Sequence, residues 1–286
     1  MLRSFLIAIL VCYAGVSYSD TFIQVRAPQG SGDVSHDYYS KLLNMALEVT
    51  EQQYEPTSVL IAPLNISQGR SFKLLKGSGR LDVEFAGTNI NRENNHHVVR
   101  VPLTMGLLGT RLLVINKDCK SEFDAIEQPQ QLQQMKACQG AHWPDSDILE
   151  GNGYTVVRSP KFEHMWRMLE HGKCDYFPRA LIEGYGEVER FGADKFMAYD
   201  HILLSYRFPM YFFFADNMPH MAKRVEEGLQ ILLSSGALQD FLTNHPVTSA
   251  AFPLEKYQNS IKFDLHNPDL SPETEQLDAK FWLALD

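Results

Sequence analysis

The chain has 286 residues, of which 44% are hydrophobic, 21% charged and 11% aromatic, and no segment of it repeats. This composition excludes a disordered tail, a collagen-like rod and a short disulfide-stapled domain, and the length suffices for about two compact units with their own cores. The 26 basic and 35 acidic side chains give a formal net charge of −9 without any run of Lys or Arg, which argues against a nucleic-acid partner.

The first nineteen residues have the three parts of a secretory signal peptide. A basic start at Arg3 is followed by an apolar stretch, residues 5–16, and by small residues that end at Ser19. This stretch is shorter than the roughly 20 residues that span a bilayer, and no later stretch exceeds it. We therefore predict cleavage after Ser19 and a protein without stable membrane insertion. The alternative is a lipid anchor at Cys12, although Val11 stands where a bacterial lipobox has a small residue.

Three cysteines remain after this cleavage, namely Cys119, Cys138 and Cys174. An exported chain meets an oxidising compartment, so the sequence allows one disulfide and one leftover thiol, and it does not choose among the three pairings. The alternative is three buried cysteines that act as small hydrophobic residues. No CxxC and no Cys/His spacing points to zinc.

The first half of the exported chain alternates between short apolar runs and segments of helical periodicity. Between Tyr38 and Val49, apolar side chains recur at three- and four-residue steps, which places them on one face of a helix. Ser67 can cap another helix that stops at Gly77. Such alternation is typical of a parallel α/β unit. The expected strands are 22–27, 58–62, 81–86 and 107–116.

The second half repeats this alternation after a polar, Gln-rich stretch, residues 121–134, where we place a boundary between lobes. The expected strands are 137–140, 154–157, 175–178 and an apolar run over 202–215, and the expected helices are 159–172, 181–188 and 219–235. The tail, residues 267–286, is polar with a short amphipathic end that should pack back onto the body.

Several segments occur together in the order seen in bacterial solute-binding proteins of family 3. They are GRSFKLLKGSGRLDVEFAGT (69–88), NRENNHHVVRVPL (91–103) leading into GLLGTRLLVI, GKCDYFPR (172–179), and MYFFFADN followed by a helix. The chain resembles the extracytoplasmic receptors of amino-acid uptake systems over nearly its whole exported length. It is most similar to a divergent branch that carries QGAHWPD (139–145) and DYFPR.

The resemblance implies an α/β, two-lobed type II periplasmic binding protein fold, in which each lobe is a mixed, mostly parallel sheet flanked by helices. Residues 20–116 plus 210–286 would form lobe 1 and residues 117–209 lobe 2, with a two-strand hinge that closes the lobes on a solute. The implied protein is a monomeric periplasmic receptor that hands a small solute to a membrane permease for ABC-type uptake. The alternative is a stand-alone ligand-sensing domain that reports to a membrane sensor.

Receptors of this family typically hold the ligand carboxylate with an Arg shortly after a Ser or Thr, and the ammonium with an Asp at the end of a second-lobe strand. Thr88 and Arg92 stand near the first position, although Arg92 precedes Glu93 where the common order is Glu then Arg. Arg179 stands roughly where that Asp is expected. Because a guanidinium matches a carboxylate two bonds at a time, we expect a carboxylate-bearing or anionic solute. An internal ion pair with Glu183 is the alternative for Arg179.

Further candidates for the cleft come from strand ends and loops. Arg26 and Arg70 follow strand or loop ends, where cleft residues usually lie, and each is otherwise a solvated surface charge. Tyr38 and Tyr39 are adjacent at the start of a helix, and one of them could cover a ligand. We select Tyr38 as the ligand-binding candidate. The alternative is that both side chains belong to the core. Trp143 lies in a loop after a strand and is a ligand-binding candidate.

No motif in the sequence indicates an enzyme. The ten histidines invite a metal site, but His96 and His97 are adjacent and point to opposite faces of a strand. There is no HExxH, no GxSxG elbow and no Walker loop. We therefore predict a binding protein without catalytic residues, metal or cofactor.

Overall fold

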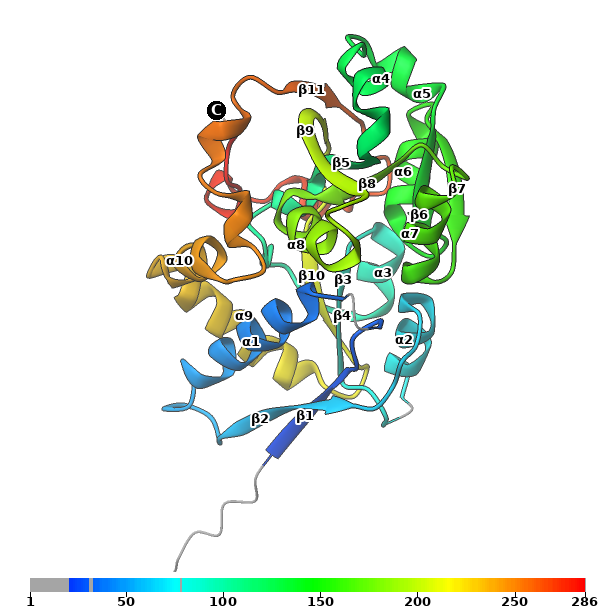
Figure 1. The fold of residues 1–286 in the computed structure, drawn as a ribbon. Helices are drawn as coiled ribbons and strands as arrows, with labels where there is room; N and C mark the ends of the chain where they lie inside the picture. The colour runs from blue at the N-terminus through cyan, green and yellow to red at the C-terminus, as the bar shows by residue number, and fades with distance from the viewer. Residues whose placement is uncertain (1–20, 31–32, 78, 286) are drawn as a thin grey trace, which may run out of the picture.

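The structure is a computed structural model that describes residues 21–30, 33–77 and 79–285. The expected signal peptide, its cleavage site after Ser19 and the possible anchor at Cys12 lie outside these residues. Two lobes are visible in Figure 1, and each is built around one β-sheet with helices packed against it. Within the described ranges, no helix is long and apolar enough to cross a membrane.

Lobe 1 surrounds a five-stranded sheet. In spatial order its strands are β2 (Thr57–Ala62), β1 (Thr21–Arg26), β3 (Val83–Gly87), β10 (Met210–Phe214) and β4 (His97–Val99). β1 runs parallel to β2 and β3, whereas β10 is antiparallel to β3 and β4. Side chains alternate across β10, so Phe212 and Phe214 join the main core while Phe213 packs with Phe72 in a smaller one.

Helices of lobe 1 cover both faces of this sheet. They are α1 (Ser35–Glu48), α2 (Gln68–Leu75), α3 (Ile90–Asn95), α9 (Pro219–Ser234) and α10 (Ala237–Asn244). The periodic apolar face expected from Tyr38 onward is the buried face of α1 as far as Ala46, whereas Val49 follows the helix and is exposed. Gly228 lets α9 approach α1 closely, since a Cβ there would lie 2.0 Å from the carbonyl oxygen of Ala46.

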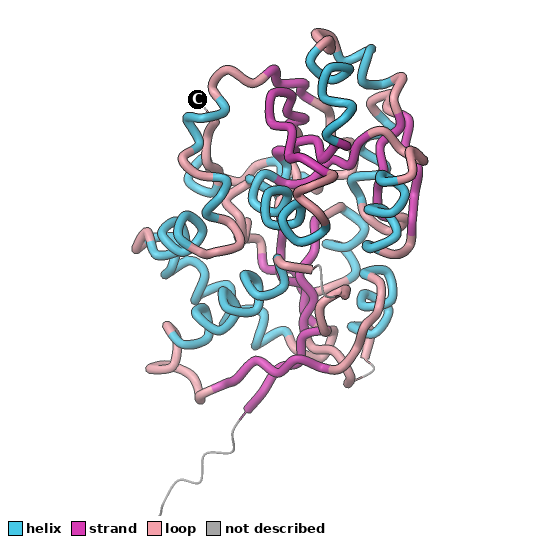
Figure 2. Tube along the Cα trace, viewed as in Figure 1, coloured by secondary structure: helices cyan, strands magenta, loops and turns pink. Residues whose placement is uncertain are grey.

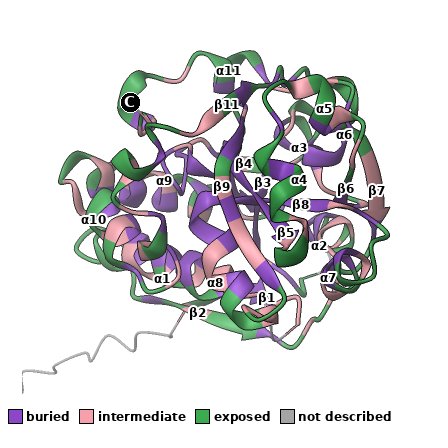
Figure 3. Cartoon of the chain, turned by 45° about the horizontal axis from the view of Figure 1, so that its top comes forward, coloured by how far each residue is buried: buried purple, intermediate pink, exposed green. Residues whose placement is uncertain are grey.

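Lobe 2 surrounds a six-stranded sheet. In spatial order its strands are β11 (Ile261–Asp264), β9 (Phe196–Ser205), β5 (Thr110–Asn116), β8 (Tyr176–Ala180), β6 (Lys136–Gly140) and β7 (Thr155–Ser159). β5 is antiparallel to β8 and β9, and the remaining pairs are parallel. Both sheets are therefore mixed, as expected. In Figure 2 some strands run through the middle of the molecule, whereas β1 and β2 run along its lower edge, and Figure 3 shows many of the strands buried.

Short helices flank the second sheet. They are α4 (Lys120–Asp124), α5 (Pro129–Gln133), α6 (Pro144–Gly151), α7 (Phe162–Glu170) and α8 (Leu181–Phe191). The polar stretch 121–134, where we expected a boundary between lobes, forms α4 and α5 and lies beside the second sheet. One short helix, α11 (Pro272–Glu275), lies in the tail, and the 3₁₀ turns are Leu107–Gly109, Lys117–Cys119, Ser249–Ala251, Leu254–Tyr257 and Ala279–Phe281.

Two of the segments through which the chain crosses between the sheets, residues 100–109 and 206–209, lie side by side, and the chain crosses again between β10 and β11. The Tyr206 amide donates to the Gly109 carbonyl oxygen over 3.0 Å, and a Cβ on Gly109 would lie 2.0 Å from the carbonyl oxygen of Tyr206.

Sheet pairing groups β5 and β11 with the second sheet, whereas the expected boundaries assign both to lobe 1. The apolar run 202–215 forms two strands, the end of β9 and β10, because the chain crosses between them.

One disulfide joins Cys138 of β6 to Cys174, which lies just before β8, with the two Cα atoms 5.5 Å apart. Cys119 keeps a half-buried free thiol. This is one of the three pairings that the sequence left open. The tail packs back as expected, since Phe281 is buried in the main core and Trp282 packs against it.

Candidate functional site

A cavity of about 80 Å³ lies between the two lobes. Its wall includes Arg26, Gln29, Asp33, Ser35, Tyr39, Gln68, Phe85 and Gly87 from lobe 1, Arg111, Trp143, Pro144, Asp145, Phe162, Arg179, Glu183 and Glu187 from lobe 2, and Leu108, Phe208 and Met210 beside the crossing segments. Arg26 and Gly87 are the last residues of β1 and β3, and Arg179 lies near the end of β8. The cavity therefore lies at the carboxyl ends of parallel strands, where ligands of α/β proteins usually bind.

Arg26 is buried and paired with two carboxylates of lobe 1. Its Nε donates to Glu84 Oε1 over 3.0 Å and its Nη1 to Asp33 Oδ2 over 3.2 Å, while the guanidinium lies 4.8 Å from the centre of the Phe85 ring. Burial acts to raise the pKa of Asp33, but the adjacent Arg26 charge and the hydrogen bonds from the Gln29 amide and Arg26 together outweigh it and leave that pKa below its ordinary value. Arg26 thus lines the cavity, and its positive charge is balanced by the carboxylates of Asp33 and Glu84.

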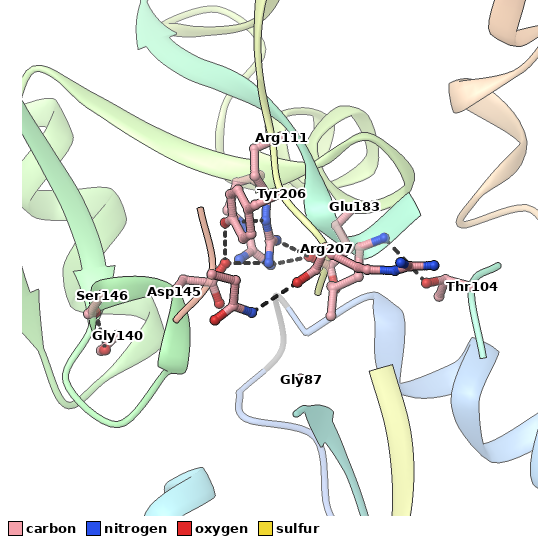
Figure 4. A network of polar contacts seen from close by, with 12 residues as sticks. Gly87, Thr104, Arg111, Gly140, Asp145, Ser146, Glu183, Tyr206 and Arg207 are labelled. Carbon is pink, nitrogen blue, oxygen red and sulfur yellow. Dashed lines mark hydrogen bonds and ion pairs between the residues drawn. The ribbon is translucent and has the colours of Figure 1, made fainter. Parts of the chain in front are cut away.

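Arg111 is held by Asp145 and Tyr206 (Figure 4). Its Nη2 donates to Asp145 Oδ1 and its Nε to the Tyr206 hydroxyl over 3.0 Å, and that hydroxyl donates to the same carboxylate oxygen over 2.5 Å. Asp145 lies in the first turn of α6, where the helix dipole favours a negative charge. None of these three residues was among the candidates from the sequence. The position of Arg111 inside the apolar run GLLGTRLLVI is nevertheless a signal of a buried ion pair.

Arg179 lines the cavity and forms the internal ion pair that was its alternative interpretation. Its Nη2 donates to Glu183 Oε2 over 2.8 Å and to Glu187 Oε1 over 2.7 Å, and its Nε to Glu187 Oε2 over 2.6 Å. The guanidinium also lies 5.1 Å from the ring centre of Trp143. Burial raises the pKa of Glu187 to about 7, against the opposing effect of Arg179.

The expected preference for an anionic solute depended on guanidiniums that have no internal partner. Each of the three arginines on the cavity wall, Arg26, Arg111 and Arg179, is bonded to at least one carboxylate. The structure therefore does not supply the free guanidiniums on which that preference was based.

Arg92 lies behind the cavity wall and joins the lobes. Its guanidinium donates to the Gly87 carbonyl oxygen, to Gln68 Oε1 over 2.7 Å and to the carbonyl oxygen of His142, in lobe 2, over 2.8 Å. Burial lowers the pKa of Arg92 to about 10. Thr88 is also buried, and its hydroxyl donates to Glu93 Oε1 over 2.7 Å. Neither Thr88 nor Arg92 forms part of the cavity wall.

Of the three remaining candidates from the sequence, Trp143 lines the cavity, whereas Tyr38 and Arg70 do not. Trp143 lines the cavity and packs on Gly140, where a Cβ would lie 2.4 Å from the indole Cδ2. Tyr38 does not reach the cavity, because its hydroxyl donates to the Leu103 carbonyl oxygen over 2.8 Å and its ring stacks on Phe241. Arg70 is exposed on α2 and lies away from the cavity wall.

Tyr39, the neighbour that the sequence analysis weighed beside Tyr38, is the residue that lines the cavity. Its side chain is buried and its ring stacks on Phe85 with the ring centres 4.8 Å apart. Its hydroxyl has no hydrogen-bond partner. A buried hydroxyl without a partner is costly unless a ligand or water satisfies it.

Across the ranges that the structure describes, no group of three or more His, Cys, Asp or Glu side chains could hold a metal ion. The chain's acidic cavity residues are instead bonded to arginines, as described above.

No family model and no curated protein matches the chain. Solved structures do match at low identity. An ancestral arginine-binding protein bound to arginine is 12% identical with a TM-score of 0.56, over 77% of this chain and 96% of that one. A structure from work on glutathione import through GshT and the cystine ABC importer TcyBC of Streptococcus mutans is 13% identical, with a TM-score of 0.55 over 79% and 95% of the two chains.

A histidine kinase sensor domain with similarity to periplasmic binding proteins matches to the same degree, with 16% identity and a TM-score of 0.54 over 78% of this chain and 94% of that one. These likenesses show the fold. The chain has the two-lobed α/β fold of type II periplasmic binding proteins, which its resemblance to family 3 implied.

Proposed function

We propose that the chain is an extracytoplasmic receptor that traps a small polar solute between its lobes and delivers it to a membrane permease of an ABC-type importer. The observation that carries this proposal is the cavity itself, since residues of both lobes line it and one of them, Tyr39, has a buried hydroxyl without a partner. Hydrogen bonding of Arg92 to lobe 2 supports a closed arrangement of the lobes. The function is binding, and no catalytic step is part of the proposal.

A second candidate is a periplasmic sensing domain that reports ligand binding to a membrane sensor. The likeness to a histidine kinase sensor domain favours it as much as the other matches favour transport. Deletion of the gene distinguishes the two. Loss of solute uptake supports transport, whereas normal uptake with loss of a solute-dependent transcriptional response supports sensing.

Ligand binding is tested by a thermal-shift screen of residues 20–286 against a metabolite library. A solute present at about 100 times its dissociation constant should add about 2.7 kcal/mol to the free energy of unfolding. Small-angle scattering should then show a smaller radius of gyration with the solute than without it, because the hinge closes. If no solute stabilises the protein, the proposed receptor function is wrong.

Export to the periplasm is part of the same proposal. Mass spectrometry of the exported protein should give an N-terminus at Asp20. A full-length cytoplasmic product, or a lipid on Cys12, would contradict a soluble periplasmic receptor.

A further inference from the structure

We infer that the solute is a small organic cation, an ammonium compound that carries no carboxylate. The inference depends on the proposed function, since it assigns a ligand class to the same cavity. Three observations carry it: the balance of charge on the cavity wall, the pairing of every arginine there, and the unpartnered hydroxyl of Tyr39.

The cavity wall carries an excess of negative charge. Three guanidiniums, of Arg26, Arg111 and Arg179, face four carboxylates, those of Asp33, Asp145, Glu183 and Glu187. With all four ionised the wall carries one negative charge in excess, and because the pKa of Glu187 is raised to about 7, this excess is complete only above that pH. Among the buried charges outside the wall, Glu84 and Arg92 cancel each other and Glu93 is paired with Arg100, so they leave this excess unchanged. Arg224 is bonded to Thr50 and does not line the cavity. A ligand with one positive charge would neutralise the site, whereas an anion would add to its charge.

The arginines are already engaged in the way that a ligand carboxylate would require. Arg179 donates two bonds to Glu187 and one to Glu183, and Arg111 donates to Asp145 and Tyr206. Each of these guanidiniums already balances a buried carboxylate, so a ligand carboxylate would bring a further negative charge into a site whose arginines are neutralised. A solute without a carboxylate avoids this cost.

Tyr39 provides the polar group that a cation would use. Its side chain is 1% exposed, its hydroxyl has no partner, and burial together with the nearby Glu183 charge holds its pKa well above the ordinary value. The group is therefore a neutral phenol whose oxygen can accept a hydrogen bond from an ammonium N–H. Phe85 and Phe208 line the same cavity and offer apolar surface to an alkyl chain.

The cavity also limits the size of the solute. Its volume is about 80 Å³, and one water needs about 10–15 Å³ on this measure, so a ligand of on the order of five to eight heavy atoms fits. Butylamine and putrescine have this size, and 4-aminobutyrate and butyrate are matched compounds that carry a carboxylate.

The test is calorimetry of the mature wild-type protein with these four compounds, repeated with the variants Tyr39→Phe and Tyr38→Phe. We expect at least one of the two amines to bind about 10-fold or more tightly than 4-aminobutyrate, and butyrate not to bind. Tyr39→Phe should weaken binding of the amine about 10-fold. Tyr38→Phe is the matched control, because the Tyr38 hydroxyl is bonded inside the core and should leave amine binding within about twofold of wild type.

Two results would overturn the assignment to a cation: binding of 4-aminobutyrate or butyrate as tight as that of the amines, or no binding of either amine. Equal amine binding by wild type and Tyr39→Phe would remove Tyr39 from the site and overturn the inference as stated. The library screen separates these failures from a failure of the receptor proposal. If another solute stabilises the protein, the receptor function stands and only the ligand class is wrong.

Discussion

Arg92 of α3 and His142 of lobe 2 are joined by a hydrogen bond from the guanidinium Nη2 to the backbone carbonyl oxygen, 2.8 Å long. Arg92 also donates to two groups of lobe 1, through Nη1 to the Gly87 carbonyl oxygen and through Nη2 to Gln68 Oε1. The His142 ring also packs against Gly69 of α2, where a Cβ would lie 3.1 Å from Cγ of the imidazole. Hinge opening as proposed above would separate these groups, so we predict that the contact favours the closed state over an open one.

Arg92→Ala should therefore weaken solute binding without direct contact between Arg92 and the solute. A hydrogen bond from a charged donor is worth about 1.5–3 kcal/mol, so we expect the dissociation constant to rise about 10-fold or more. Small-angle scattering at saturating solute should show a larger radius for the variant. Arg70→Ala is the matched control, because Arg70 is an exposed arginine on α2. Wild-type affinity and an unchanged radius in Arg92→Ala would show that the contact does not hold the lobes together.

Most of the fold could be predicted from the sequence, because it depends on local patterns. Apolar periodicity located α1 and α9, and short apolar runs located β1, β2 and β6 to within a few residues. The short elements α3, β4 and β11 were missed because each depends on a distant partner rather than on its own pattern. β11, for example, is defined by pairing with β9, which lies about 60 residues earlier in the chain.

The candidate site was predicted less completely. Arg26, selected from a strand end, and Arg179, selected through the family resemblance, both line the cavity, and their role in ligand binding stays a prediction. Their carboxylate partners Glu84 and Glu187 are set by tertiary packing. Helical periodicity did not distinguish Tyr38 from its neighbour Tyr39 as the residue that lines the cavity. Adjacent residues on a helix point about 100° apart, so a small difference in how α1 rotates against the sheet decides which hydroxyl reaches the cavity.

Gly140→Ala should disturb the site through Trp143. A Cβ at this position would lie 2.4 Å from the indole ring, so the ring has to move away from the Arg179 guanidinium that it covers. We expect a lower melting temperature and weaker solute binding, both measured by thermal shift. Gly151→Ala is the matched control, since a Cβ there meets nothing within 4 Å in α6 and should be neutral or stabilise by up to about 1 kcal/mol. Equal behaviour of the two variants would contradict the packing of Trp143 on Gly140.

The disulfide between Cys138 and Cys174 should stabilise lobe 2. The bond closes a loop with a sequence separation of 36 residues, for which loss of chain entropy in the unfolded state predicts about 4 kcal/mol. We expect the double variant Cys138→Ser, Cys174→Ser to unfold at lower urea concentration than wild type, and a reductant to destabilise only the wild type. Cys119→Ser should leave the urea midpoint close to that of wild type, because Cys119 is free. A disulfide that involves Cys119 in peptide mapping would overturn this pairing.

The stability of the protein should depend on pH through Glu187. Burial raises the pKa of this carboxyl from 4.5 to about 7 in the folded protein. Between these two values the folded state holds more protons at Glu187 than the unfolded state does, so this group lowers the free energy of unfolding as the pH rises from about 4.5 to about 7. Asp33 acts in the opposite direction, because its folded pKa is below the ordinary value and its contribution is lost at low pH.

Comparison of wild type with Glu187→Gln isolates the first of these effects, since Asp33 is present in both proteins. The glutamine cannot ionise. It also weakens the bonds from Arg179, but this shifts the free energy of unfolding by a constant amount and does not change its slope against pH. Urea unfolding at several pH values should therefore show that the free energy of unfolding of the wild type, measured relative to the variant, decreases across this window and is constant above about pH 8. Two parallel pH profiles would mean that Glu187 titrates near its ordinary value, and an increase across the window would mean that Arg179 dominates burial at this carboxylate.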